Sequence, residues 1–152
     1  MQRTRWQNLA LIALVVGAVS LMVLRTVTTR GHSPVPVPVT TWVGLAVVAV
    51  AVLLLGRAVR RFTAGQPTRM DALRAARVAV LAKASSLSGS ALAGYFAAQV
   101  LVSLTNLGAP MLETQAWSAG IALLASLALV VVAVVVESWC EVPPDDDGEP
   151  AT

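Results

Sequence analysis

The chain has 152 residues but few that can do covalent or metal chemistry, because it contains one cysteine and one histidine. The lone Cys140 excludes an internal disulfide. His32 has no carboxylate or thiol near it in the sequence, so it makes a poor metal ligand. A glycine-rich phosphate loop, a catalytic pair of acids and metal-ligand spacing are also missing from the sequence. We therefore expect a protein that is not an enzyme and that uses no cofactor and no metal.

Charged residues are scarce as well. They make up 12% of the chain, against 57% for hydrophobic residues, whereas soluble chains carry about 25% charged residues. Each of four apolar stretches approaches or reaches the roughly 20 residues that a helix needs to cross a bilayer. These stretches are Leu9–Leu24, Trp42–Gly56, Ala84–Leu104 and Trp117–Val136. A chain this short has no polar layer left to enclose such helices in a soluble core.

The sequence therefore predicts an all-α polytopic membrane protein with four transmembrane helices. We place this domain at residues 1–138, with spans at about 7–24, 40–58, 80–104 and 117–137. The four tryptophans stand at the ends of the predicted spans, where an amphipathic ring prefers the headgroup level. The first span follows a basic start that also fits a signal peptide, but no small-x-small cleavage site follows it in the expected place, so we expect it to be retained.

The distribution of cations predicts the orientation. With both termini inside, the inner segments hold Arg3, Arg5, Arg57, Arg60, Arg61, Arg69, Arg74, Arg77 and Lys83. The outer loops hold only Arg25 and Arg30. The positive-inside rule then predicts a multi-pass protein of the cell membrane with both termini in the cytoplasm. Because the cations sit at membrane edges and not on a face interleaved with aromatic residues, we expect no nucleic-acid partner.

The third helix carries the most informative pattern. Gly65-Gln66-Pro67 ends the second helix, and the third should begin near Arg69 and run to about Leu104. That length exceeds the membrane, so two to four turns should project into the cytoplasm. One row on this helix is small throughout: Ala82, Ser86, Ser90, Gly94 and Ala98. Such repeats let helix backbones approach closely in lipid, here against the first helix or a second copy of the chain.

A second row of the same helix is polar. Ser85, Ser88, Tyr95 and Gln99 lie along one side of it, at steps of three, seven and four residues. They fit either interhelical hydrogen bonds or the lining of a groove for a small solute or lipid. Proton or ion relays usually need an ionisable group at depth, and no acid or base lies in the middle of a predicted span.

Charged residues at the inner border suggest two further interactions. Lys83 and Glu137 should lie at the same depth if the third and fourth helices are antiparallel, so they either form a pair or reach the headgroups separately. Arg77 is the competing partner of Glu137. A basic collar should contact anionic lipid; it consists of Arg57, Arg60, Arg61, Arg74 and Arg77.

Two segments outside the spans are rich in proline. PVPVPV at 34–39 predicts an extended connector or, alternatively, a docking strand for an extracytoplasmic partner. The tail at 139–152 combines paired prolines with an acidic run and no apolar periodicity. We expect this cytoplasmic tail to be disordered.

Three segments carry a resemblance to a known family. They are the RTR near the start, DALRAARVAVLAKASSLSGSALAGY at Asp71–Tyr95 and VESWCEVPPDDD at Val136–Asp147. With them, nearly the whole chain resembles the actinobacterial domain-of-unknown-function family 3180. The resemblance implies a four-helix integral membrane protein and assigns no activity.

Two functional hypotheses follow. The first is an accessory or scaffold component of the membrane that associates, through the small row, with another membrane protein or with a second copy of itself. The alternative is a small transporter or lipid-handling protein that uses the polar side of the third helix.

Overall fold

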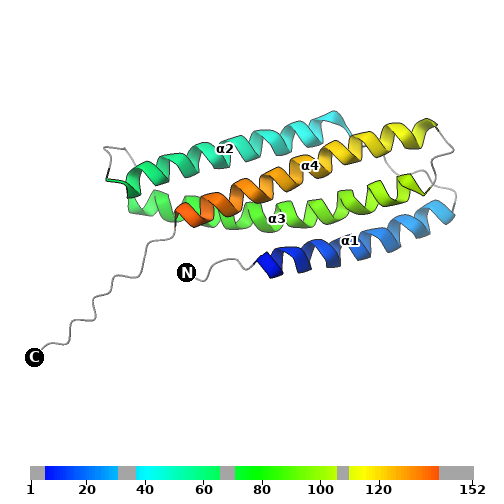
Figure 1. Ribbon diagram of the computed structural model, residues 1–152, viewed down its shortest axis with the longest axis horizontal. Helices are drawn as coiled ribbons and strands as arrows, with labels where there is room; N and C mark the ends of the chain where they lie inside the picture. The colour runs from blue at the N-terminus through cyan, green and yellow to red at the C-terminus, as the bar shows by residue number, and fades with distance from the viewer. Residues whose placement is uncertain (1–5, 31–36, 66–70, 106–109, 141–152) are drawn as a thin grey trace, which may run out of the picture.

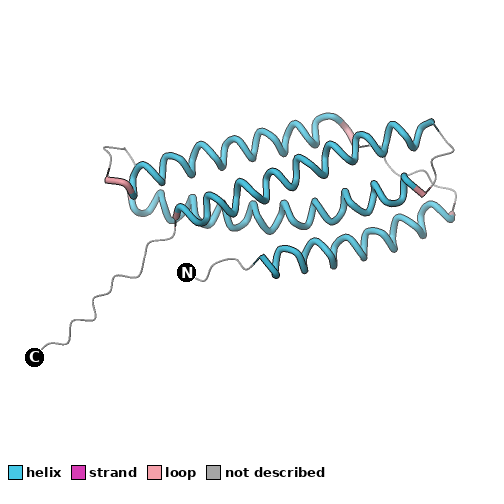
Figure 2. Tube along the Cα trace, viewed as in Figure 1, coloured by secondary structure: helices cyan, strands magenta, loops and turns pink. Residues whose placement is uncertain are grey.

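A computed structural model describes residues 6–30, 37–65, 71–105 and 110–140 as a bundle of four long helices (Figure 1). The helices are α1 (Trp6–Thr29), α2 (Val39–Thr63), α3 (Ala72–Leu104) and α4 (Pro110–Trp139). Each is long and apolar enough to cross a membrane. The predicted all-α membrane fold with four helices is confirmed, and Figure 2 shows helices and short connecting turns but no strand in the described part of the chain.

Proline and glycine mark the boundaries of the helices. Pro38 is extended, with φ −67° and ψ 148°, and precedes the first residue of α2. Gly65 follows α2 with φ 71°, a left-handed conformation that glycine adopts without steric cost. Its N–H donates to the carbonyl of Phe62 over 3.0 Å and closes the last turn. Pro110 opens α4, where its missing N–H costs no helical hydrogen bond.

Several predicted features fall on residues outside the described part. They are the tail from residue 141 onward, most of the proline-rich loop with His32, and the predicted start of the third helix at Arg69. The described part of α3 begins at Ala72 and ends at Leu104. Trp139, which we assigned to the tail, is the last residue of α4.

The helices alternate in direction, with α4 and α3 between α2 and α1 (Figure 1), and α3 is the helix that touches all three others. It packs extensively against both α4 and α1, while α2 packs mainly against α4 and touches α3 less. Within the described residues α1 contacts α3 and no other helix. The first helix is therefore held on one side only.

The buried side chains of the bundle are mostly small. A cluster at one end joins α2, α3 and α4 and consists of Val52, Val59, Val78, Ala82 and Val136. Elsewhere the buried residues are mostly alanine, serine and glycine, with a few larger side chains such as Phe96 and Leu129. Because lipid tails are as apolar as these side chains, close van der Waals packing has to hold the helices together.

Candidate functional site

The small row of α3 lies inside the bundle. Ala82, Ser86, Ser90, Gly94 and Ala98 are all buried. A Cβ atom at Gly94 would overlap the carbonyl oxygen of Ala13 and would lie 3.0 Å from the backbone nitrogen of Gly17. A Cβ atom at Gly17 would in turn lie 3.2 Å from the carbonyl oxygen of Gly94. The two helix backbones are therefore in direct contact, and the partner of Gly94 is α1.

The hydroxyls of this row are bonded within their own helix. Ser86 Oγ donates to the carbonyl of Lys83 over 2.9 Å, and Ser90 Oγ donates to that of Leu87 over 2.8 Å. These two serines are thus small enough for close helix packing, and each hydroxyl proton has an acceptor within α3. Because the row is covered by the chain itself, a partner protein has to bind another surface.

Two further glycines allow close contacts with α4. A Cβ atom at Gly89 would lie 2.9 Å from Cγ2 of Val130. A Cβ atom at Gly56 of α2 would lie 2.7 Å from Cγ1 of Val136. Each helix pair that packs closely therefore has a glycine at its contact.

The polar side of α3 is divided between exposed and buried groups. Ser88 and Tyr95 are exposed, whereas Ser85 and Gln99 are buried. Gln99 Nε2 donates to Tyr95 Oη over 2.8 Å, and the Tyr95 ring meets Phe96 edge-on with 5.4 Å between ring centroids. This hydrogen bond joins two residues of α3 and is therefore not one of the interhelical bonds that the sequence left open as one of two alternatives.

A buried polar group on α4 escaped the sequence analysis. Gln115 is 5% exposed, and Gln99 and Ser103 of α3 are 3% and 0% exposed. Gln99 Oε1, Ser103 Oγ and Gln115 Nε2 have no hydrogen-bond partner among the described residues. Gln115 lies two residues before the predicted span, so a search for polar residues beside the spans would have found it.

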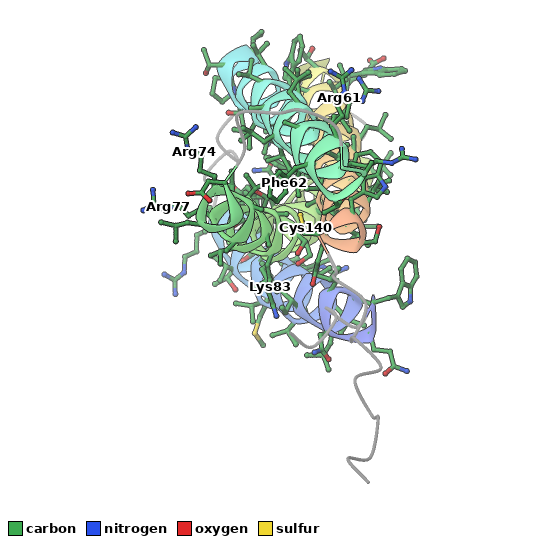
Figure 3. The ribbon with its side chains drawn as sticks, turned by 90° about the vertical axis from the view of Figure 1, so that its left-hand side faces the viewer. Arg61, Phe62, Arg74, Arg77, Lys83 and Cys140 are labelled. Atoms are coloured by element: carbon green, nitrogen blue, oxygen red, sulfur yellow. The ribbon has the colours of Figure 1, made fainter. Side chains whose placement is uncertain are left out.

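Cations collect at one end of the bundle. Arg57, Arg60 and Arg61 end α2, and Arg74, Arg77 and Lys83 lie in the first turns of α3. All six are exposed, and Figure 3 shows Arg61, Arg74, Arg77 and Lys83 around this end. The guanidinium carbon of Arg60 lies 5.1 Å from the centroid of a ring of Trp139. We call this the cationic end; Arg25, near the end of α1, and Arg30, directly after that helix, lie at the other end.

Lys83 and Glu137 both belong to the cationic end. Lys83 is exposed, and the side chain of Glu137 is half-buried with its Oε2 atom fully covered. Cys140 follows α4, and burial, together with the negative charge of Glu137, raises the pKa of its thiol. The pairing of Lys83 with Glu137 stays a prediction.

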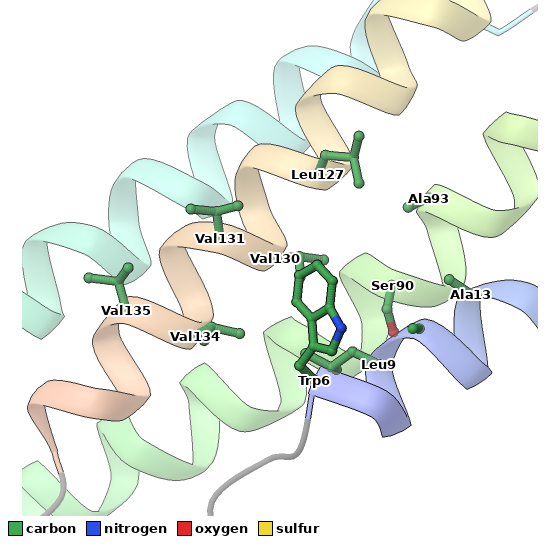
Figure 4. Close-up of a pocket in the computed structure, with 11 residues that line it drawn as sticks. Trp6, Leu9, Ala13, Ser90, Ala93, Leu127, Val130, Val131, Val134 and Val135 are labelled. Atoms are coloured by element: carbon green, nitrogen blue, oxygen red, sulfur yellow. The ribbon is translucent and has the colours of Figure 1, made fainter.

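An apolar groove lies between α1 and α4, and α3 forms its floor. Its volume is about 310 Å³. It is lined from α1 by Trp6, Leu9, Ala10 and Ala13, from α3 by Ser90 and Ala93, and from α4 by Leu127, Val130, Val131, Val134 and Val135. Figure 4 shows the Trp6 indole standing between the two walls, near Val130 and Val134. The groove lies on a different side of α3 from Ser88, Tyr95 and Gln99, so it is not the polar path considered from the sequence.

Four apolar helices in one short chain define a small multi-pass membrane protein. The chain belongs to the family described as protein of unknown function (DUF3180), whose model matches residues 9–144. No curated protein and no solved structure matches the chain.

Proposed function

We propose that this protein is a non-enzymatic accessory or scaffold component of the cell membrane, with both termini on the cytoplasmic side. The observation that carries the proposal is that, within the described residues, the backbone of α1 packs closely against α3 alone. Its opposite face remains apolar and exposed, with Leu11, Val15 and Met22 at 62%, 49% and 74% exposure. A helix held on one side can pack its other side against a helix of another membrane protein or of a second copy.

The cationic end supports the proposed orientation. Positive residues favour the cytoplasmic side of short membrane loops, and six exposed cations of the described residues lie at this end. They would also attract the anionic lipids of the cytoplasmic leaflet. The protein would then be fixed in the membrane with its α1 face open to a partner.

Photo-crosslinking in native membranes tests the accessory role. A photoreactive amino acid replaces Leu11 or Val15 on the outer face of α1, and Val50 on α2, also exposed, serves as the matched control. We expect one discrete protein adduct from the two α1 positions and none from Val50. Adducts to lipid alone at Leu11 and Val15, or the same protein adducts at all three positions, would contradict the proposal.

The second candidate is a lipid-handling function, and the apolar groove favours it. A groove between helices of a membrane bundle is accessible to acyl chains, and apolar walls with few polar groups are typical of sites that bind such ligands. Transfer of labelled phospholipid between vesicles, with and without the protein, tests this function. An unchanged transfer rate would contradict it.

A further inference from the structure

We infer that the groove between α1 and α4 binds one acyl chain of an anionic phospholipid, taken from the leaflet that faces the cationic end. This inference deepens the lipid-handling candidate because it names the ligand class and its binding site. It rests on the shape of the groove, on the chemistry of its walls and on the charge at one end of it.

The walls fit an alkyl chain. Apart from the Trp6 indole nitrogen, Ser90 carries the only polar side-chain atom of the lining, and its hydroxyl already donates to the carbonyl of Leu87. Beyond that indole N–H, the lining side chains thus offer no donor that would favour water or a polar solute. The bilayer around the protein supplies acyl chains at high concentration.

The shape of the groove suits a flexible occupant. The groove has a volume of about 310 Å³ and is walled by α1, α3 and α4. Part of an alkyl chain can enter this space and follow it along the helices.

The register of α1 and α3 places charge at one end of the groove. The two helices run in the same direction (Figure 1). Gly17 lies against Gly94. Trp6 precedes Gly17 by the same number of residues as Lys83 precedes Gly94, so Trp6 and Lys83 lie at the same level of the bundle. Tryptophan prefers the headgroup level of a bilayer. An acyl chain in the groove therefore brings its phosphate level with Lys83.

The charge of the cationic end as a whole favours an anionic headgroup. Six exposed cations lie at the cationic end, where the described carboxylates are Asp71 and Glu137. A cation near the membrane surface contributes about 1 kcal/mol to the binding of anionic lipid. One such cation corresponds to about fivefold in affinity. The groove should accordingly prefer phosphatidylglycerol to phosphatidylcholine with the same acyl chains.

Native mass spectrometry of the full chain in mild detergent tests this inference, with either phospholipid added. Ala10 lines the groove and is exposed, so Ala10→Phe should fill the groove without disturbing a helix contact. Ala18→Phe is the matched control, because Ala18 is an exposed alanine of the same helix outside the groove. Lys83→Gln tests the charge. Unchanged helix content by circular dichroism shows that each variant is folded.

We expect the unaltered protein and Ala18→Phe to retain one phosphatidylglycerol, about fivefold more often than phosphatidylcholine. Ala10→Phe should lose both lipids, and Lys83→Gln should lose the preference but keep binding. Retention of phosphatidylglycerol without faster lipid transfer between vesicles would support the site and contradict the lipid-handling function. Equal retention by Ala10→Phe and Ala18→Phe, or equal retention of the two phospholipids by the unaltered protein, would overturn the inference.

Discussion

Gly94 sets the distance between α1 and α3, because any side chain there would meet the backbone of the neighbouring helix. The spacing of small residues predicts a close approach at this position, but it leaves two partners open, the first helix and a second copy of the chain. A row of small residues specifies how near a backbone can come and not which backbone it is. The structure gives α1 as the partner because Gly17 and Ala13 meet Gly94.

Gly94→Ala should therefore destabilise the bundle. The added methyl overlaps the Ala13 carbonyl, and overpacking of this kind costs about 1–3 kcal/mol. Gly44→Ala is the matched control, because nothing lies within 4 Å of a Cβ atom there and alanine is the better helix former by about 0.5–1 kcal/mol. Unfolding by SDS in mixed micelles, followed by circular dichroism, measures both variants. Equal stability of the two would contradict the direct contact of the backbones.

The predicted pair of Lys83 and Glu137 also belongs to the scale of single residues. A partly solvated pair contributes about 1 kcal/mol or less to stability. Lys83→Met and Glu137→Gln should each lower the stability, because removing one charge of the pair leaves the other uncompensated. The double variant should recover part of the loss, since it removes both charges. The same unfolding experiment measures this double-mutant cycle. Strictly additive losses would show that the two charges act independently.

Cys140 provides a chemical test of the charge on Glu137. Burial and, to a smaller extent, that carboxylate raise the pKa of the thiol, so less of the reactive thiolate is present at a given pH. Iodoacetamide should thus react with Cys140 more slowly than with a free cysteine at mildly alkaline pH. Glu137→Gln should lower the pKa and speed the reaction, but the rate should stay below that of the free cysteine because burial remains.

The control for this reaction is Glu113→Gln, since Glu113 lies in the first turn of α4, at the opposite end of the helix. In that variant, iodoacetamide should alkylate Cys140 at the same rate as in the unaltered protein. If Glu137→Gln leaves the pH dependence of alkylation unchanged, the carboxylate has no effect on the pKa of Cys140.

Among the helices, α3 has the central position and α1 the peripheral one. Hydrophobic length alone predicts four helices, and the long third helix with its small row predicts the central one. The groove has no such signature in the sequence, because it arises where α1 and α4 fail to meet across α3. Its lining residues come from three separate spans, and in the sequence most of them are ordinary apolar positions.

This arrangement predicts that the contacts of α1 and α2 contribute independently to stability. Gly56 meets Val136 of α4, and Gly94 meets α1, so the two contacts share no residue. The destabilisation by Gly56→Ala and by Gly94→Ala should add to within about 0.5 kcal/mol in the double variant. A larger deviation, measured by SDS unfolding, would show that α1 and α2 are coupled through α3.

For the whole molecule, the separation of charge between the two ends of the bundle connects the fold with the proposed function. Six described cations lie at one end, and Arg25 and Arg30 lie at the other. If the cationic end faces the cytoplasm, the collar and the end of the groove meet the anionic leaflet there. The position of the collar and of the groove relative to the two leaflets therefore depends on the proposed orientation.

Accessibility of single cysteines in intact cells tests this claim most directly. In a Cys140→Ser background, one cysteine at a time replaces His32, between α1 and α2, Gly108, between α3 and α4, or Gln66, between α2 and α3. A thiol reagent that does not cross membranes should label positions 32 and 108 from outside and leave position 66 unlabelled until the cells are opened. Labelling of position 66 in intact cells, with 32 and 108 protected, would contradict the proposed orientation.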